Sequence, residues 1–184
     1  MNLLIKDVRL AFPAIFEAES VNGGDAKFSA GLLLPTDHPQ LAEIKAAMVE
    51  VAKGKWGAKA KETYDKLEAT DKLALHDGNL KSEYDGFADM LYINASNSVR
   101  PTVVDRDRTP LVQADGKPYA GCYVNASIEL WAQDNKFGKR INASLRGVQF
   151  LRDGDAFSGG GAAAADEFDD LSDGAGAAAG GDLW

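Results

Sequence analysis

Hydrophobic and polar residues alternate along most of the chain, which is the pattern of β-strands with one buried face. The first such stretch covers residues 3–20, and the second covers 26–35. Between them, the sequence VNGGD at 21–25 is rich in turn-forming residues, so the two stretches predict a β-hairpin. Further along, more stretches combine alternation with flanking turn residues and are expected to be strands: 87–96, 100–111, 121–134 and 140–153.

A helical pattern interrupts the strands after the first hairpin. Leu41, Ile44, Met48 and Val51 recur at helical spacing, which places them on one face of a helix. Glycines then break the pattern, and a second helix is expected over 58–69. A β-rich body with this insertion predicts a mainly β (α+β) fold, either an OB-fold-like small β-barrel or a small sandwich. Periodicity alone does not distinguish these two architectures.

A nearly identical pentapeptide occurs on three of the expected strands, as YINAS at 92–96, YVNAS at 123–127 and RINAS at 140–144. Alternation turns the second and fourth residues toward the core and the other three to the opposite face. Asparagine is depleted in strands because its side chain competes for backbone hydrogen bonds. Its recurrence therefore indicates a functional surface. The alternatives are that the likeness arose by chance, or that the aromatic residues pack beneath a loop.

The outward positions of these strands combine flat rings, guanidinium groups and short amides. They are Tyr92, Asn94, Tyr123, Asn125, Trp131, Arg140, Asn142 and Arg146. Nucleobases stack on aromatic or guanidinium planes, and amides hydrogen-bond base edges or sugars. Stacking contributes about 1–3 kcal/mol per base and tolerates any sequence. We therefore interpret this surface as a binding face for single-stranded nucleic acid.

Basic residues cluster in two segments beside expected turns, where long side chains can line a groove and meet phosphates. They are Arg100, Arg106, Arg108, Lys136, Lys139 and Arg140. In the first segment Asp105 and Asp107 alternate with the arginines. An ion-paired hairpin is therefore an equally open interpretation of that segment.

The formal net charge of −8 is distributed unevenly along the chain. There are 28 acidic and 20 basic residues, and the whole excess of acids follows Arg152, after which no lysine or arginine occurs. Residues 1–152 are therefore expected to form a charge-balanced domain. Residues 153–184 are mostly Gly, Ala and Asp, and such a segment cannot bury enough apolar surface to offset its ordering entropy. We expect it to be a disordered acidic tail, a composition typical of interaction tails.

The sequence contains no pattern typical of catalysis or metal binding. His38 and His76 lack partners at metal-ligand spacing, and no phosphate loop, nucleophile elbow or zinc motif occurs. A nuclease that used the acids of DRD at 105–107 would need a third ligand, which no motif supplies. We therefore expect no enzymatic activity, no cofactor, no bound metal and no small-molecule substrate.

The single cysteine and the N-terminal residues indicate the cellular compartment in which the protein is expected. Cys122 has no partner for an internal disulfide and is expected to be a small buried hydrophobe. The start MNLLIKDVRL lacks the long apolar core of a signal peptide, and no run approaches membrane-spanning length. A cytoplasmic protein without a membrane partner is expected.

Several blocks of the sequence resemble a family of phage single-stranded DNA-binding proteins. They are KSEYDGFADM, NASNSVRPTVVDRDRTPL, DGKPYAGCYVNASIELWAQDN and GKRINASLRGVQFLRDGDAF. The likeness is strong over residues 80–158 and weaker over 1–79. It implies an OB-fold that coats single-stranded DNA during phage replication or recombination in the host cytoplasm, without catalysis.

The acidic segment ends in Asp182, Leu183 and Trp184, and it resembles the tails of bacterial and phage single-stranded DNA-binding proteins. In those tails a hydrophobic tip docks on replication proteins, and the acids compete with DNA for the basic groove. The resemblance thus implies replication or recombination proteins as partners of the tail, and DEFDDL at 166–171 has the same acidic-hydrophobic character. The alternative function is a β-rich interaction or virion protein whose tail binds a partner without nucleic acid.

Overall fold

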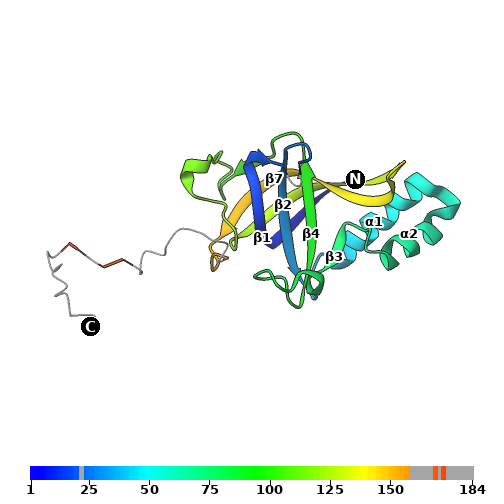
Figure 1. The fold of residues 1–184 in the computed structure, drawn as a ribbon, viewed down its shortest axis with the longest axis horizontal. Coiled ribbons are helices and arrows are strands. Elements are labelled where there is room, and N and C mark those ends of the chain that lie inside the picture. The colour runs from blue at the N-terminus through cyan, green and yellow to red at the C-terminus, as the bar shows by residue number, and fades with distance from the viewer. Residues whose placement is uncertain (21–22, 158–167, 170, 173–184) are drawn as a thin grey trace.

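The computed structural model describes residues 1–20, 23–157, 168–169 and 171–172 (Figure 1). The strands are β1 (Asn2–Glu19), β2 (Lys27–Pro35), β3 (Leu75–Asp77), β4 (Met90–Asn97), β5 (Thr102–Val104), β6 (Tyr123–Asn135) and β7 (Gly138–Arg152). The α-helices are α1 (Leu41–Trp56) and α2 (Ala60–Ala69). Short 3₁₀ turns are η1 (Gly57–Lys59), η2 (Gly78–Lys81) and η3 (Gln113–Asp115).

Five of the strands close into a barrel. β1 pairs with β2 and β6, β2 pairs with β4, and β6 pairs with β7, all antiparallel. β4 then pairs parallel to β7 and completes the ring. The short strands β3 and β5 extend the sheet beside β4 and β7. This five-stranded closed barrel is OB-fold-like, so the barrel prediction is confirmed and the sandwich is excluded.

The prediction of one strand over 100–111 is wrong, because the strand in the structure is much shorter. Only Thr102–Val104 pairs with β7, and the chain then turns, because the Asp105 N–H donates to the Thr109 carbonyl at 2.8 Å. The Asp107 carboxylate accepts the Thr109 N–H at 3.0 Å. Aspartates satisfy local backbone donors in this way and favour turns over longer strands.

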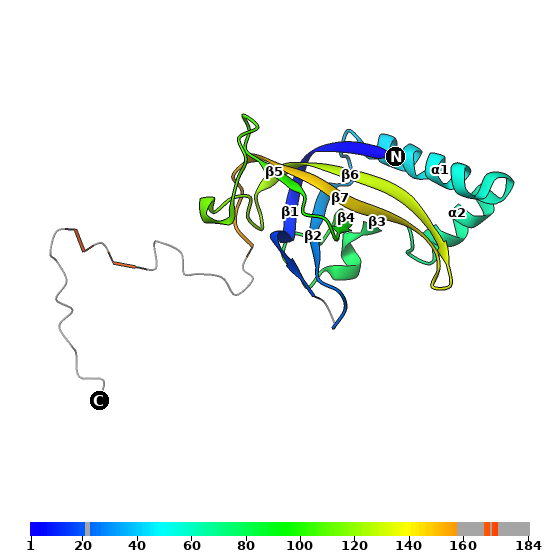
Figure 2. The same cartoon turned by 90° about the horizontal axis from the view of Figure 1, so that it is seen from above.

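The helical insertion covers one end of the barrel (Figure 2) and is anchored at both ends of α1. Gln40 precedes α1, and its side chain donates to the Leu4 carbonyl at 2.9 Å and accepts the Lys6 N–H at 2.7 Å. At the other end, Trp56 Nε1 donates to Asp134 Oδ2 of β6 at 2.9 Å. Ile44 of α1 is fully buried in the hydrophobic core. The predicted insertion after the first hairpin is therefore confirmed.

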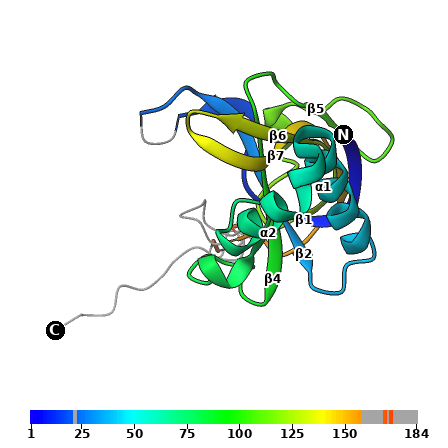
Figure 3. The ribbon, with the colours of Figure 1, turned by 90° about the vertical axis from the view of Figure 1, so that its right-hand side faces the viewer.

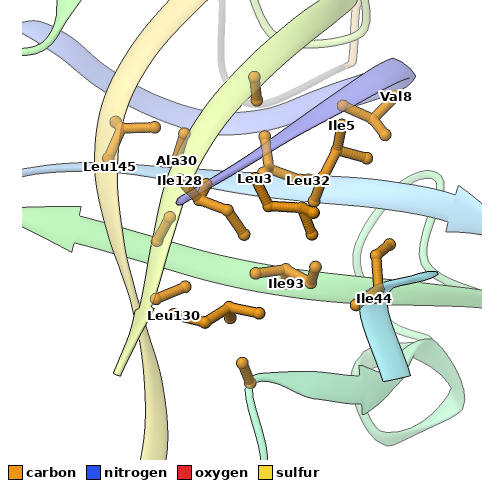
Figure 4. Packing of buried hydrophobic residues seen from close by; sticks show 14 of the residues in the cluster. Leu3, Ile5, Val8, Ala30, Leu32, Ile44, Ile93, Ile128, Leu130 and Leu145 are labelled. Atoms are coloured by element: carbon orange, nitrogen blue, oxygen red, sulfur yellow. The ribbon is translucent and has the colours of Figure 1, made fainter. Parts of the chain in front are cut away.

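The barrel interior is filled by inward side chains from all five strands (Figure 4). The inward positions of the three pentapeptides are all buried: Ile93, Ala95, Val124, Ala126, Ile141 and Ala143. Their burial confirms the alternation predicted for these strands. Cys122 is also fully buried, and burial raises the pKa of its thiol above the usual range. The thiol therefore stays protonated and serves the packing of the core, as expected.

Candidate nucleic-acid interface

Two of the three pentapeptides meet where β4 and β7 pair. Ser96 lies opposite Ser144 in this parallel pairing, which sets the two NAS triplets side by side. On the other edge of β7, Asn142 lies opposite Trp131 of β6. The outward positions of β4, β7 and β6 therefore form one continuous surface.

This surface is hollowed into a groove of about 490 Å³, called the β4–β7 groove below. Its walls include Lys27, Asn94, Ser96, Trp131, Arg140 and Asn142. Lys27 is the first residue of β2, just after the loop of the β1–β2 hairpin, and Arg140 lies near the tip of the β6–β7 hairpin. Both hairpins project from the same side of the barrel (Figure 3). Oligonucleotides bind OB-folds on the sheet face between these two hairpin loops.

Hydrogen bonds fix the orientation of the polar groups in the β4–β7 groove. Trp131 is 41% exposed, and its Nε1 donates to Ser144 Oγ at 3.0 Å. Asn142 Nδ2 donates to Gln133 Oε1 at 2.9 Å. A surface held in place before binding loses little conformational freedom when a ligand arrives, which favours affinity.

The cations of the β4–β7 groove are free to meet an anion. Lys27 and Arg140 are exposed, and none of the ion pairs found among the described residues involves them. Lys139 is exposed too, but it does not line the groove, and after the hydrogen bond from Lys66 its charge helps to lower the pKa of Glu62 on α2. Lys136 is also exposed, at the tip of the β6–β7 hairpin. A row of unpaired basic side chains beside an exposed indole is suited to a phosphate backbone with stacked bases.

The prediction that Tyr92 offers an open ring is wrong. Tyr92 points to the outer side of the barrel, but it is only 3% exposed because the segment that follows β3 covers it. Its ring stacks on His76 at 5.0 Å and meets the edge of Phe87 at 5.2 Å. Burial raises the pKa of Tyr92. The ring is therefore a packing element under a loop, which was one of the alternatives drawn from the sequence.

Tyr123 and Asn125 also lie outside the β4–β7 groove. Arg152 lies over the Tyr123 ring, with 4.1 Å from Cζ to the ring centroid, so this face of the ring already contacts a cation. Asn125 Oδ1 accepts the Asp7 N–H at 3.0 Å, and its Nδ2 donates to Gln149 at 3.2 Å. The three predicted rings therefore do not form one platform, since Trp131 alone among them lines the groove.

Two other predicted residues line a second hollow, of about 300 Å³. Asn125 and Arg146 line it together with Thr102 of β5. Because β5 pairs with the C-terminal part of β7, this hollow lies at a different part of that strand from the groove. Arg106 and Arg108 are exposed in the turn after β5. The predicted residues are thus divided between the groove, the second hollow and positions outside both, and do not form one site.

Arg100 lies near the β4–β7 groove, and among the described residues Asp105 and Asp107 do not pair with the neighbouring arginines. Arg100 is exposed two residues after Ser98, which lines the β4–β7 groove. Asp105 pairs with Lys117 at 2.9 Å, and this hydrogen bond lowers the pKa of Asp105. No ion pair between Asp105 or Asp107 and an arginine occurs within residues 23–157. This segment is therefore not a hairpin held by aspartate–arginine ion pairs.

Sequence reasoning missed four polar residues of the groove: Lys27, Asn97, Ser98 and Gln133. Lys27 lies two residues after the VNGGD turn, so a search for basic residues beside that turn would have found it. Gln133 follows Trp131 by two residues, so the outward alternation of β6 would have indicated it, and it lies opposite Arg140.

The residues just after β7 pack on the barrel. The Tyr119 hydroxyl donates to Asp153 Oδ1 at 2.7 Å, and the Phe157 N–H donates to the Ala120 carbonyl at 3.1 Å. The predicted partner-binding residues Asp182, Leu183 and Trp184 lie outside the described residues.

The part of the chain that the structure describes contains neither a metal-binding cluster nor a membrane-spanning helix. Groups of three or more His, Cys, Asp or Glu side chains placed to hold a metal ion do not occur among its residues. None of its helices is long and apolar enough to span a bilayer.

Comparison with known sequences decides the family. The pattern of one family, described by the ssDNA-binding protein of Enterobacter phage Enc34, matches residues 1–178. The chain belongs to this family. The resemblance inferred from the sequence blocks is thereby confirmed. Another similar sequence, putative protein p50 of Acyrthosiphon pisum secondary endosymbiont phage 1, is 49% identical over 176 residues, which cover 94% of this chain and 95% of that protein.

Solved structures resemble this Enc34-family chain over most of its length. The single-stranded DNA-binding protein of bacteriophage Enc34 in complex with ssDNA matches with a TM-score of 0.71 and 27% identity, covering 85% of this chain and 89% of that chain. The single-stranded DNA-binding protein gp2.5 of bacteriophage T7 matches with a TM-score of 0.57 and 12% identity, covering 86% and 90%. The second likeness concerns the fold alone.

Proposed function

We propose that this Enc34-family protein binds single-stranded DNA, largely without sequence preference and without catalysis, during phage DNA replication or recombination in the host cytoplasm. The observation that carries the proposal is the β4–β7 groove, in which an exposed indole, ordered amides and unpaired cations meet between two hairpins. The solved complex of the Enc34 protein with ssDNA supports it.

The proposed binding mode assigns a role to each class of side chain. The Trp131 ring stacks on a base, which is a contact that every base can make. The amides of Asn94 and Asn142 hydrogen-bond base edges or sugars, and Lys27 and Arg140 contact phosphates from opposite ends of the groove. Lys136 and Lys139 continue the basic row along the β6–β7 hairpin.

Single strands are the preferred ligand because stacking on Trp131 requires a base with a free face. In duplex DNA both faces of each base are already stacked, so the groove would contact only the backbone. Since residues 1–152 carry equal numbers of acidic and basic residues, no overall positive field attracts a duplex. The proposed preference for single-stranded over duplex DNA therefore follows from stacking on the Trp131 ring and not from the net charge.

The acidic segment after the barrel is proposed to have two effects. Its carboxylates compete with DNA for the basic groove, and its acidic-hydrophobic stretches, DEFDDL and Asp182–Trp184, recruit replication or recombination proteins. The support for this role is the confinement of the entire acidic excess to residues 153–184.

A gel-shift comparison at moderate salt tests the proposal. Labelled oligo-dT and a duplex of equal length are titrated with the full chain, with unlabelled competitors of mixed sequence as a check on sequence preference. We expect oligo-dT to be shifted at protein concentrations at least tenfold lower than the duplex needs. Equal shifts of both ligands, or no shift of either, would remove the proposal.

A further inference from the structure

A third hollow, of different chemistry, lies beside the start of the segment that follows β7. It has a volume of about 270 Å³ and is lined by the rings of Phe12, Tyr84, Phe87 and Phe157, and we call it the aromatic pocket. The Phe12 ring is 58% exposed and stands edge-on to Tyr84, with 5.1 Å between the ring centroids. Exposed clusters of aromatic rings on a soluble protein mark binding surfaces more often than chance allows.

The backbone around the aromatic pocket is shaped to present these rings. Phe12 has a φ of 46°, which is uncommon for a bulky residue, in an irregular stretch of β1 where its register with β2 shifts. Irregularities of this kind re-aim a side chain out of the regular alternation. Gly86 has a φ of 84°, and a Cβ at this position would collide with the Phe157 ring. Strain at Phe12 and the need for glycine at 86 both serve to build the pocket.

The rim of the aromatic pocket is acidic, since Glu83 and Asp85 line it. Carboxylates repel phosphates, so a nucleic-acid strand is disfavoured here. The acidic stretch DEFDDL of the same chain is disfavoured for the same reason. The pocket instead fits an apolar side chain that is flanked by positive charge.

The tip of the β6–β7 hairpin has this complementary chemistry. Phe137 is 78% exposed, and its neighbours Lys136 and Lys139 are exposed cations. The Phe137 N–H donates to Asn135 Oδ1 at 2.9 Å, which fixes the turn, and Lys136 Nζ lies 5.1 Å from the Phe137 ring centroid. The hairpin tip therefore presents an exposed aromatic ring between positive charges, and we call the Phe137 side chain the plug.

The plug cannot reach the pocket of its own chain. The hairpin tip and residues 153–157 lie at opposite ends of the barrel (Figures 1 and 2). A head-to-tail contact between different patches on two copies can repeat from copy to copy, and it builds an open row when the rotation between copies does not close a ring. We propose that Phe137 of one copy inserts into the aromatic pocket of the next copy, with Lys136 facing Glu83, and so joins copies bound along one DNA strand. This inference depends on the proposed function, because the DNA strand aligns the copies.

Binding to short and long ssDNA separates this contact from DNA binding itself. Phe137→Ser removes the plug, Phe12→Ser opens the pocket, and Val112→Ser is the matched control, since Val112 is an exposed apolar residue outside both surfaces. On oligo-dT that accommodates one protein, we expect all three variants to bind within about twofold of the parent chain. On a dT polymer of several hundred nucleotides, both phenylalanine variants should bind about tenfold more weakly, and Val112→Ser should not.

Two further variants test the pairing of the two surfaces. Because Lys136 also belongs to the proposed basic row, the readout is polymer affinity divided by affinity for the one-protein oligo-dT. Lys136→Glu and Glu83→Lys should each lower this ratio, and the double variant should recover it, because the charges are exchanged across the contact. A mixture of Phe137→Ser and Phe12→Ser retains one intact junction per pair, so it should form pairs on a two-site oligonucleotide but no longer rows on the polymer.

Other outcomes overturn the inference in distinguishable ways. If the phenylalanine variants lost affinity for short and long DNA equally, the rings would contact nucleobases and not a second copy. If they lost affinity for neither ligand, the two surfaces would not meet at all. Failure of the parent chain to bind the short oligonucleotide would instead remove the proposed function.

Discussion

At the residue scale, the local surroundings of each ring decide what it can do. Trp131, Tyr92 and Tyr123 all occupy outward strand positions, but His76 and Phe87 cover Tyr92 and Arg152 lies over Tyr123. Trp131 has only a hydrogen bond from its indole nitrogen to Ser144, which leaves it 41% exposed. Trp131 is therefore the ring to which a stacking role can be assigned.

Trp131→Ala should lower oligo-dT affinity by about 5- to 100-fold, the loss expected for one stacked base at about 1–3 kcal/mol. Trp131→Phe keeps a ring without the hydrogen bond to Ser144 and should retain most of the affinity. Fluorescence anisotropy measures both, and thermal melting checks the fold. An alanine variant that bound like the parent chain would show that no base stacks there.

Arg140→Ala should reduce the slope of log affinity against log salt by about one unit, since one phosphate contact is lost. Arg108→Ala removes the same charge from an exposed turn outside the β4–β7 groove and is the matched comparison. Salt titrations of oligo-dT binding measure both slopes. The assignment of phosphates to the groove fails if Arg108→Ala flattens the slope and Arg140→Ala does not.

At the scale of elements, alternation and turn residues predicted the first hairpin, the helical insertion and the inward residues of the barrel strands. They could not predict that β4 pairs parallel to β7, because this register depends on closure of the whole barrel. For that reason the sequence grouped Asn125 with Asn94 and Asn142, although β6 carries Asn125 to another part of the barrel. The sequence also could not predict that the Tyr92 ring is covered, because the covering segment is a loop without hydrophobic periodicity.

The β6–β7 hairpin is held to the insertion by the bond from Trp56 Nε1 to Asp134 at 2.9 Å. Trp56→Phe keeps the ring but removes this donor, so the free energy of unfolding should fall by about 0.5–1.5 kcal/mol. Hydrogen exchange should become faster at residues 133–140 and remain unchanged in β1 and β2. Unchanged exchange in the hairpin would mean that the bond does not restrain it.

At the scale of the whole molecule, charge separates the barrel from the acidic segment after it. The proposed phosphate contacts of the barrel come from a few cations without ion pairs among the described residues, whereas all of the net negative charge lies after Arg152. The proposed competition between the acidic segment and DNA for these cations is electrostatic, so salt should weaken it.

Removal of residues 158–184 should tighten oligo-dT binding several-fold at low salt, and the gain should vanish at high salt. This truncation keeps Phe157, whose packing against the barrel would otherwise be lost. Replacement of the aspartates in this segment by asparagine retains its length and should give the same gain. Weaker binding by both variants would contradict competition by the acidic segment.

Photocrosslinking of an oligonucleotide that carries 5-iodouracil, followed by mass spectrometry, tests the location of the binding site most directly. Iodouracil reacts with aromatic rings that stack on it, so the site of attachment reports the stacked residue. We expect the crosslink on Trp131, with its loss in Trp131→Ala and its retention in Tyr84→Ala. A dominant crosslink on Tyr123, Phe12 or Tyr84 would contradict the assignment of single-stranded DNA to the β4–β7 groove.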